Sequence, residues 1–168
     1  ADIHGTLATQ DLHRDNPYSH PWMERALDAP DIDGNDRRLL ARIVADYELA
    51  QELDLPRGII HGDLFRDNVL FDQGELTGIL DFYHACDDFL IQDIAICIND
   101  WCRLASGEID IERRDALLLG YESRRALTSA ETDYLPLFQK FAAARFALTR
   151  LLSGETGPYL KDPAELLT

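Results

Sequence analysis

One stretch decides how this chain folds: IIHGDLFRDNVLF at residues 59–71, followed by ILDF at residues 79–82. The apolar pair at the start of the stretch predicts a short buried strand that runs into a polar loop. Residues 69–71 and 76–80 predict the two strands of a hairpin, because the turn-forming run QGE separates them. Such a hairpin brings Asp81, which follows its second strand, beside the polar loop that precedes its first strand.

The polar residues of this stretch suit phosphoryl transfer with magnesium. Mg²⁺ takes oxygen ligands, usually one or two carboxylates together with phosphate oxygens, and Asn68 and Asp81 offer such oxygens. Asp63 would orient a substrate hydroxyl and accept its proton, as the aspartate of the protein-kinase loop HRDxxxxN does. Here the loop reads HGDxxxxN, and a tyrosine follows Asp81-Phe82 where the kinase template has glycine. A polar loop of this composition is also typical of an ordinary turn.

The loop and the hairpin resemble those of the aminoglycoside phosphotransferase and choline kinase superfamily, whose loop reads HGDxxxxN before an IDF or IDW segment. Within that superfamily, five segments are similar to the bacterial homoserine kinases: DLFRDNVLF at 63–71, DFYxAC at 81–86, DxAIxxNDWC at 93–102, ARF at 144–146 and KDP at 161–163. The resemblance covers most of the chain, is strongest over residues 59–102 and is thin before residue 35. It implies a mainly helical α+β fold, the C-terminal lobe of a protein-kinase-like enzyme, with a small β-hairpin that carries the catalytic and metal residues.

The resemblance also implies an activity: transfer of the ATP γ-phosphate to the hydroxyl of L-homoserine in threonine biosynthesis, with ATP and Mg²⁺ as cofactors. Asp63 would be the catalytic base, and Asn68 and Asp81 would hold the metal and the nucleotide phosphates. Asp93 lies in an apolar helix, where an unpaired carboxylate is costly, and would brace the backbone of the catalytic loop, which His61 would also support. The alternatives are a kinase of choline or an aminoglycoside, and a non-catalytic helical binding module.

Three further side chains are candidates for contacts with the acceptor. Arg145 lies on or beside an apolar helical stripe. It forms a salt bridge, packs its aliphatic stem on the core, or binds a substrate carboxylate through its planar guanidinium. Asp87, in an acidic pair, either lies in water or at a helix start, or it meets a substrate ammonium group. Asn99 either lines the acceptor pocket or faces water.

Hydrophobic periodicity predicts helices around this centre. A helix over residues 36–53, capped by Asn35 or Asp36, precedes the first strand and carries no chemistry of its own. The other predicted helices cover residues 90–104, 109–124 and 130–152, with a short one at 22–27 and an indistinct one within residues 1–14. We expect residues 82–89 to form a loop.

Composition narrows the class of protein. The chain has 168 residues, of which 46% are hydrophobic and 28% charged, as in ordinary globular proteins. The net charge of −15 argues against nucleic acid or an anionic membrane as a partner. No apolar run approaches the roughly 20 residues that span a bilayer, and the N-terminus has no signal pattern. Cys86, Cys97 and Cys102 are predicted to be buried free thiols of a cytoplasmic protein. We expect His4 and His13 to be surface or core residues.

The nucleotide-binding elements of kinases are not found in the sequence. It has no glycine-rich phosphate loop and no strand lysine of the VAIK type before the catalytic loop. We therefore expect residues 1–168 to form a single kinase-like C-terminal lobe, with a surface tail at 153–168, that works with an N-terminal lobe of the same enzyme. Phosphoryl transfer depends on positioning and charge neutralisation. We expect the acidic chain alone to transfer phosphate poorly or not at all.

Overall fold

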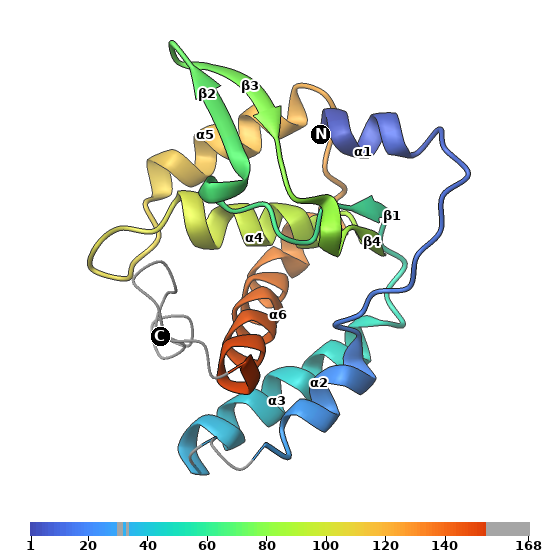
Figure 1. Ribbon diagram of the computed structural model, residues 1–168, viewed down its shortest axis with the longest axis vertical. Helices are drawn as coiled ribbons and strands as arrows, with labels where there is room; N and C mark the ends of the chain where they lie inside the picture. The colour runs from blue at the N-terminus through green and yellow to red at the C-terminus, as the bar shows by residue number, and fades with distance from the viewer. Residues whose placement is uncertain (30–31, 33, 154–168) are drawn as a thin grey trace.

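The computed structural model describes residues 1–29, 32 and 34–153. Within these residues the regular structure is mainly helical, with two small antiparallel sheets (Figure 1). The helices are α1 (Asp2–Leu7), α2 (His20–Ala26), α3 (Gly34–Ala50), α4 (Ile91–Trp101), α5 (Ile111–Glu122) and α6 (Ser129–Ser153). The strands are β1 (Arg57–Ile60), β2 (Val69–Asp72), β3 (Glu75–Ile79) and β4 (Cys86–Phe89), and 3₁₀ turns form at Arg66–Asn68 and Phe82–His84. This is the mainly helical α+β fold that the sequence predicts.

The two sheets frame the polar loop. Strands β2 and β3 form the predicted hairpin, whose turn residues Gln73 and Gly74 have positive φ angles of 50° and 86°, as two-residue hairpin turns commonly require. Strand β1 pairs antiparallel with β4, with Ile60 opposite Cys86. The prediction of a loop over 82–89 is therefore wrong. That segment holds a 3₁₀ turn and β4, because the backbone groups of β1 need hydrogen-bonding partners.

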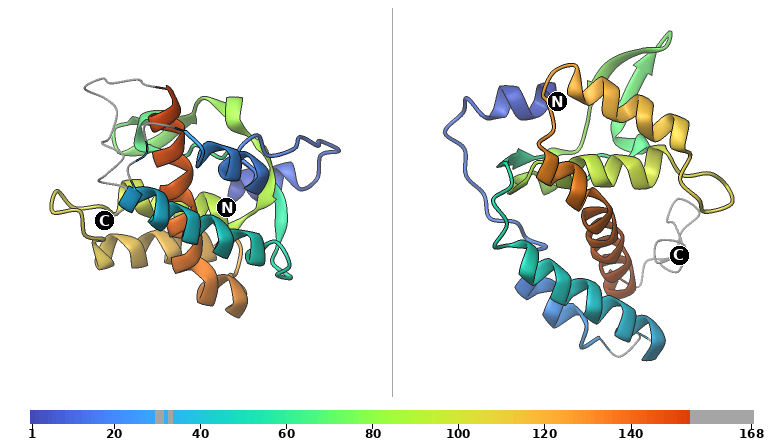
Figure 2. Two further views of the ribbon diagram at one scale, coloured as in Figure 1. Left: turned by 90° about the horizontal axis from the view of Figure 1, so that it is seen from below. Right: turned by 180° about the vertical axis from the view of Figure 1, so that it is seen from behind.

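Helix α6 is the centre of the hydrophobic core. It lies between the α2–α3 pair on one side and α4 on the other (Figures 1 and 2). Its Phe138 and Phe141 are fully buried and touch each other; Phe138 also meets Phe89 of β4, and Phe141 meets Tyr47 of α3. Burying a side chain of this size contributes roughly 1.5–3 kcal/mol. The core therefore fixes β4, and through it the strand β1 that leads into the polar loop.

Two predicted helix boundaries need correction. Helix α3 begins at Gly34, so Asn35 and Asp36 lie in its first turn and neither is the cap. The carboxylate of Asp36 still favours this end of the helix, since negative charge there complements the helix dipole. Near the N-terminus, α1 ends at Leu7, and Leu12 is exposed instead of extending an apolar face. The other helices lie within a few residues of their predicted ranges, which is the usual uncertainty of helix ends.

Other sequence predictions concern the tail, the thiols and the membrane. The predicted tail at 153–168 overlaps the described residues only at Ser153, where α6 ends, and the KDP segment lies outside them. Cys86 and Cys102 are buried free thiols, as predicted, and Cys97 is a free thiol of intermediate burial. Among the described helices, none is long and apolar enough to cross a membrane.

Candidate functional site

The polar loop after β1 turns sharply at Gly62. This residue has a φ of +76°, and a Cβ atom added to it would lie 2.8 Å from the carbonyl oxygen of His84. A side chain at this position would therefore face both an unfavourable backbone conformation and a clash with backbone. Glycine allows the loop to pass closely over the 3₁₀ turn that follows β3.

Asp93, at the start of α4, accepts hydrogen bonds from the backbone of this polar loop. Its Oδ2 accepts a hydrogen bond of 2.8 Å from the backbone N–H of His61, and its Oδ1 accepts one of 2.8 Å from the N–H of Gly62. The carboxylate is only 3% exposed. A buried carboxylate that satisfies two consecutive backbone donors fixes their direction and offsets part of its own desolvation.

His61 joins the loop to the end of the hairpin. Its ring is fully buried; Nε2 donates to the carbonyl oxygen of Leu80 at 2.8 Å, and Nδ1 accepts from the backbone N–H of Asp63 at 3.2 Å. These two bonds fit a neutral ring with its proton on Nε2. The N–H of Leu80 in turn donates to the carbonyl oxygen of Asn68 at 2.8 Å. Through these bonds, the loop and the end of β3 are held together.

The predicted catalytic and metal residues lie at this junction. The amide nitrogen of Asn68 donates to Asp63, at 2.7 Å to its carbonyl oxygen and 3.2 Å to its Oδ2. Asp81 is exposed and has the left-handed backbone angles φ 59° and ψ 59°, a conformation that is sparsely populated and often found at functional sites. It directly follows Leu80, whose N–H is bonded to Asn68, and its carboxylate, like that of Asp63, counters the lowering of the His84 pKa. The structure therefore brings Asp63, Asn68 and Asp81 together.

The charge balance at His84 reflects this arrangement. Burial lowers the pKa of its imidazole, and the nearby guanidinium of Arg145 lowers it further, whereas the carboxylates of Asp63 and Asp81 oppose the shift. The net result is a pKa below the usual value of this side chain. The site thus combines two carboxylates, two arginines (Arg145 and Arg14) and a histidine that favours its neutral form.

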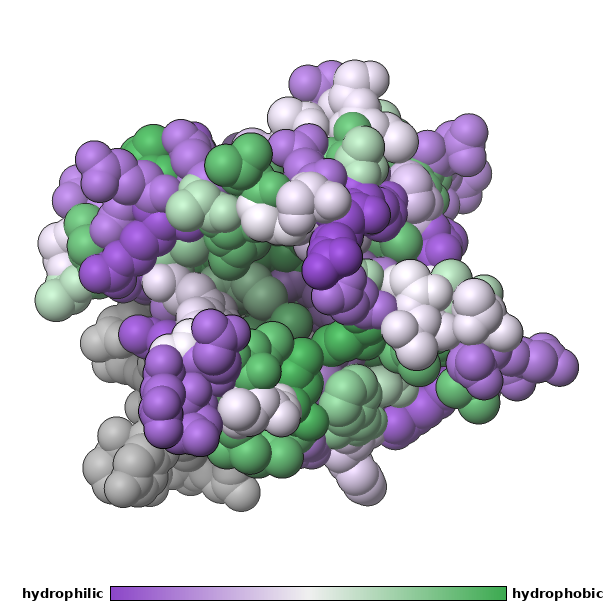
Figure 3. All heavy atoms as spheres, turned by 90° about the horizontal axis from the view of Figure 1, so that it is seen from above, coloured by the Kyte–Doolittle hydropathy of each residue, from purple (hydrophilic) through white to green (hydrophobic). Residues whose placement is uncertain are grey.

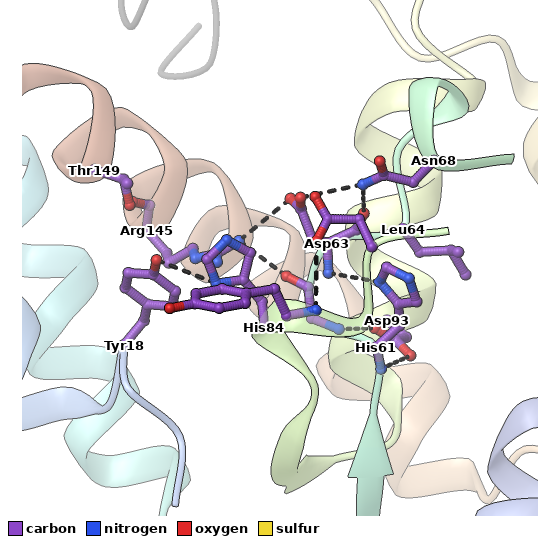
Figure 4. Close-up of polar contacts among 12 residues, drawn as sticks. Tyr18, His61, Asp63, Leu64, Asn68, His84, Asp93, Arg145 and Thr149 are labelled. Carbon is purple, nitrogen blue, oxygen red and sulfur yellow. Dashed lines mark hydrogen bonds and ion pairs between the residues drawn. The ribbon is translucent and has the colours of Figure 1, made fainter. Parts of the chain in front are cut away.

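Arg145 of α6 reaches the same loop from the opposite side to Asn68 (Figure 4). Its Nη1 donates to the carbonyl oxygen of Gly62 at 2.9 Å and lies 3.9 Å from Oδ1 of Asp63. The Cζ atom of its guanidinium lies 4.0 Å from the ring centre of Tyr18 and 3.9 Å from that of Phe146. Burial lowers the pKa of this side chain, while the charge of Asp63 opposes that shift. The salt-bridge reading of Arg145 thus describes its contacts in the structure.

Two neighbours of the site are absent from the sequence-based list. Tyr18 and His84 lie beside the Arg145–Asp63 pair, and Tyr18 Oη is 3.3 Å from His84 Nδ1 (Figure 4). With Gly62 and Arg145 they line a small cavity of about 20 Å³. No periodicity or motif singles out Tyr18. His84 could have been suspected, because it lies in the turn that follows Asp81.

The structure ties the other two acceptor candidates to different elements. Asp87 Oδ2 accepts from the backbone N–H of Arg14 at 2.8 Å and lies 2.7 Å from Nδ1 of His13. Asn99 exchanges hydrogen bonds of 2.8 and 3.2 Å with Gln139 of α6. Neither set of contacts includes the loop of Asp63. The neighbouring Asp88 is 3% exposed, so this member of the acidic pair does not lie in water.

The hairpin beside the site has an exposed apolar surface. Seen from above, this end of the molecule mixes hydrophobic and hydrophilic residues and is hollowed near its centre (Figure 3). Leu70, Phe71 and Leu76 of the hairpin are 47%, 53% and 55% exposed. Exposed apolar groups in such numbers are typical of surfaces that meet a ligand or another protein segment.

Comparison with known proteins identifies the class. A family profile described as "Phosphotransferase enzyme family" matches residues 1–127, and the chain belongs to that family. Relatives with curated descriptions include a homoserine kinase of Pseudomonas aeruginosa, 39% identical over 171 aligned positions that cover 97% of this chain and 54% of the relative. A homoserine kinase of Rhizobium meliloti is 43% identical over 152 positions, covering 88% of this chain and 47% of the relative. The chain thus spans about half the length of these relatives, and the family resemblance is confirmed.

Solved structures agree on the fold. An amicoumacin kinase, solved in complex with AMP-PNP, Ca²⁺ and Ami, superposes with a TM-score of 0.70 at 19% identity over 98% of this chain and 52% of that one. An ethanolamine kinase of Plasmodium vivax gives a TM-score of 0.60 at 16% identity, covering 99% of this chain and 53% of the other. These structures confirm the predicted kinase-like fold class.

Proposed function

We propose that this chain is the catalytic C-terminal lobe of an ATP-dependent kinase that phosphorylates the hydroxyl of L-homoserine in threonine biosynthesis. The observation that carries the proposal is that Asn68 bonds to Asp63 through its side chain and, through its carbonyl oxygen, to Leu80, the residue before Asp81. The choice of acceptor rests on the relatives, which are described as homoserine kinases. Asp93 and His61 serve in this proposal as supports of the catalytic loop.

Asp63 is the base in this mechanism. The amide of Asn68 holds one of its carboxylate oxygens, and Arg145 lies near the other, so the carboxylate has a restricted orientation toward an incoming alcohol. The hydroxyl oxygen of the acceptor attacks the γ-phosphorus while its proton passes to Asp63. The bond from that phosphorus to the bridging oxygen breaks, and ADP leaves. Because the pKa of His84 is lowered, its neutral ring adds no positive charge beside the base.

Magnesium suits the oxygen donors that are present. Asn68 uses its amide nitrogen for Asp63, which leaves its oxygen for a cation, and the Asp81 carboxylate is exposed. Among the described residues, no three His, Cys, Asp or Glu side chains converge on one point, so phosphate and water oxygens would complete the shell, as is usual for Mg²⁺. Bound Mg²⁺ would neutralise charge on the transferred phosphoryl group.

Arg145 remains our candidate for the acceptor carboxylate. Only one of its nitrogens has a hydrogen bond to the loop, and a guanidinium offers five N–H donors in a planar fork. Tyr18 and His84, which flank it, would border the acceptor. For Asp87 and Asn99, direct contact with the acceptor would require their bonds to Arg14 and Gln139 to break.

The proposal includes a partner and a compartment. The relatives are about twice as long as the matched segment, and we propose that an N-terminal lobe of the same enzyme supplies the lysine clamp for ATP. The exposed apolar hairpin supports this idea, since it offers a surface for such a lobe or for the nucleotide. Residues 1–168 alone would then transfer phosphate poorly. We assign the enzyme to the cytoplasm, in keeping with its free thiols.

The test uses the full natural polypeptide with ATP, Mg²⁺ and L-homoserine, with ADP release and ³¹P NMR of the product as readouts. Asp63→Asn should lower kcat about 10²- to 10⁴-fold, because it removes the base. Asp67→Asn is the matched control, since Asp67 lies exposed in the same loop and should leave kcat unchanged. Faster phosphorylation of choline or an aminoglycoside, or full activity of Asp63→Asn, would contradict the proposal.

A further inference from the structure

The carboxylate that braces the catalytic loop has a third hydrogen-bonding partner, His4 of helix α1. Nε2 of His4 lies 2.9 Å from Oδ2 of Asp93, the same oxygen that accepts from the N–H of His61. His4 is 5% exposed and Asp93 is 3% exposed. A residue of the first helix therefore reaches the carboxylate that supports the loop, a contact that no motif or periodicity indicates.

The neighbours of His4 fix the direction of its hydrogen bonds. Nη1 of Arg125 donates to Tyr121 Oη at 3.2 Å, and a guanidinium has no acceptor. The Tyr121 oxygen is thus an acceptor toward Arg125, and its own proton is available for Nδ1 of His4, 2.8 Å away. Burial raises the pKa of Tyr121, so this proton stays in place. Because the Asp93 carboxylate is an acceptor, the proton of the His4 ring lies on Nε2 and is donated to Asp93, and Nδ1 accepts from Tyr121.

The far end of this chain of bonds is anchored in α6. Arg125 forms an ion pair of 2.8 Å with Glu131, whose side chain is fully buried. Glu131 also accepts from the N–H of Thr128 at 2.9 Å, while Thr128 Oγ1 accepts from the N–H of Glu131 at 3.1 Å. This reciprocal pair is a capping box, which fixes the start of the helix. Glu131 of α6 thus holds Arg125 in place, and donation runs from Arg125 through Tyr121 and His4 to Asp93.

We propose that His4 is a positioning residue: its Nε2–H fixes the Asp93 carboxylate so that both of its oxygens face the backbone N–H groups of His61 and Gly62. Without this donor, the buried carboxylate would keep only its two hydrogen bonds from the loop amides, and it would be free to rotate toward one of them. The loop would then hold Asp63 less firmly. The effect on turnover rests on the proposed kinase activity, whereas the effect on the loop does not.

Two substitutions of His4 distinguish the effect of its hydrogen-bond donor from the effect of the space that its side chain fills. His4→Gln keeps an N–H donor near the position of Nε2, and His4→Met fills a similar volume without one. The first readout is amide hydrogen exchange at His61 and Gly62 in the 168-residue chain. The second is ¹⁵N NMR of the His4 ring in the unmodified chain. The third is kcat and KM of the full natural polypeptide with L-homoserine.

We expect the ¹⁵N spectra to show a proton on Nε2 of His4. His4→Met should speed exchange at His61 and Gly62 and lower kcat about 10- to 100-fold, the scale of a small misplacement of a reacting group. Its KM for ATP should change little, because Asn68 and Asp81 lie outside the chain of bonds. His4→Gln should restore most of the amide protection and most of kcat, which a merely space-filling role would not predict.

Equal exchange and equal kcat in the two variants would overturn the proposal, and so would a His4 ring that carries no proton on Nε2. If His4→Met does not fold, Tyr121→Phe replaces it: this change removes only the hydroxyl that selects the tautomer, and it should speed exchange at Gly62 to a smaller extent. If the full polypeptide phosphorylates no alcohol, the proposed function fails, but the exchange and ¹⁵N results still decide the role of His4.

Discussion

The pKa of His84 depends on several charged groups of the site, so it can be used to detect each of them. Its ring is influenced by a guanidinium from α6, by the carboxylate in the loop and by the carboxylate after β3. These three groups come from distant parts of the chain, so their joint action depends on the tertiary arrangement. A titration of this one imidazole therefore reports whether the site is assembled.

The first prediction concerns that titration. His84 should titrate below the usual histidine pKa of about 6.5, because burial and Arg145 disfavour the imidazolium. Asp63→Asn and Asp81→Asn should each lower the pKa further, since each removes a negative charge that stabilises the imidazolium. NMR of the His84 ring against pH measures these values in the 168-residue chain.

Asp72→Asn is the control for that series, because Asp72 is exposed at the end of β2 and does not contribute to the shift at His84. Its titration curve should overlay that of the unmodified chain. A His84 pKa that responds to neither Asp63→Asn nor Asp81→Asn would mean that the two carboxylates do not share one site.

At the residue scale, local spacing predicted only part of this arrangement. Asp63, Asn68 and Asp81 could be predicted because one loop and one hairpin carry them. Tyr18 and His4 could not, since each reaches the site through contacts with residues far away in the sequence. Such contacts leave no periodic pattern in a single sequence.

Among the elements, the turn at Gly62 sets how closely the catalytic loop approaches the segment after β3. An added Cβ would meet the carbonyl oxygen of His84, and φ is positive. Gly74 in the hairpin turn has φ +86° but open space around it. The two glycines therefore separate the effect of backbone strain from the effect of crowding.

The second prediction follows from this pair. Gly74→Ala should lower the free energy of unfolding by about 1–2 kcal/mol, the cost of a left-handed non-glycine residue. Gly62→Ala should cost about 2–5 kcal/mol, because about 1–3 kcal/mol for overpacking adds to that strain. Urea unfolding of both variants measures the difference. Equal losses would show that the contact with His84 relaxes without cost.

The hairpin and the helices, which have local sequence patterns, were predicted well, whereas strand β4, which has none, was not. The hairpin has a turn sequence between two apolar runs, and the helices have periodic apolar faces. Strand β4 has Asp87 and Asp88 between its apolar end residues, so its sequence shows no strand pattern. Its pairing with β1 in the structure identifies it as a strand. The capping box from Thr128 to Glu131 was a signal in the sequence that would have set the start of α6 more accurately.

On the scale of the whole molecule, the cysteines report the integrity of the core. Burial raises the pKa of Cys86 to about 12 and also raises the pKa values of Cys97 and Cys102. The thiolate is the form that reacts with alkylating reagents, so little of any of the three is reactive near neutral pH. They lie on β4 and on α4 and its C-terminal cap, which pack around the catalytic loop.

The third prediction is that iodoacetamide labels the native chain slowly, at all three cysteines together, and labels them fully in denaturing urea. Mass spectrometry of the labelled chain measures the rate at each site, and free glutathione under the same conditions gives the reference rate. Fast labelling of one cysteine in the native chain would indicate local opening of the element that carries it, and would contradict a core that opens as a unit.

The brace by Asp93 has a consequence for anyone who wishes to transplant this catalytic turn. The turn is held by hydrogen bonds from the N–H groups of His61 and Gly62 to Asp93, which lies on a helix that follows the turn in the chain. Removing that helix removes both bonds. A synthetic peptide of residues 57–81 would carry every predicted reactive group and yet lack their geometry. A graft onto another scaffold would keep this geometry only if a buried aspartate, and a side chain that donates a hydrogen bond to it, were transferred with the turn.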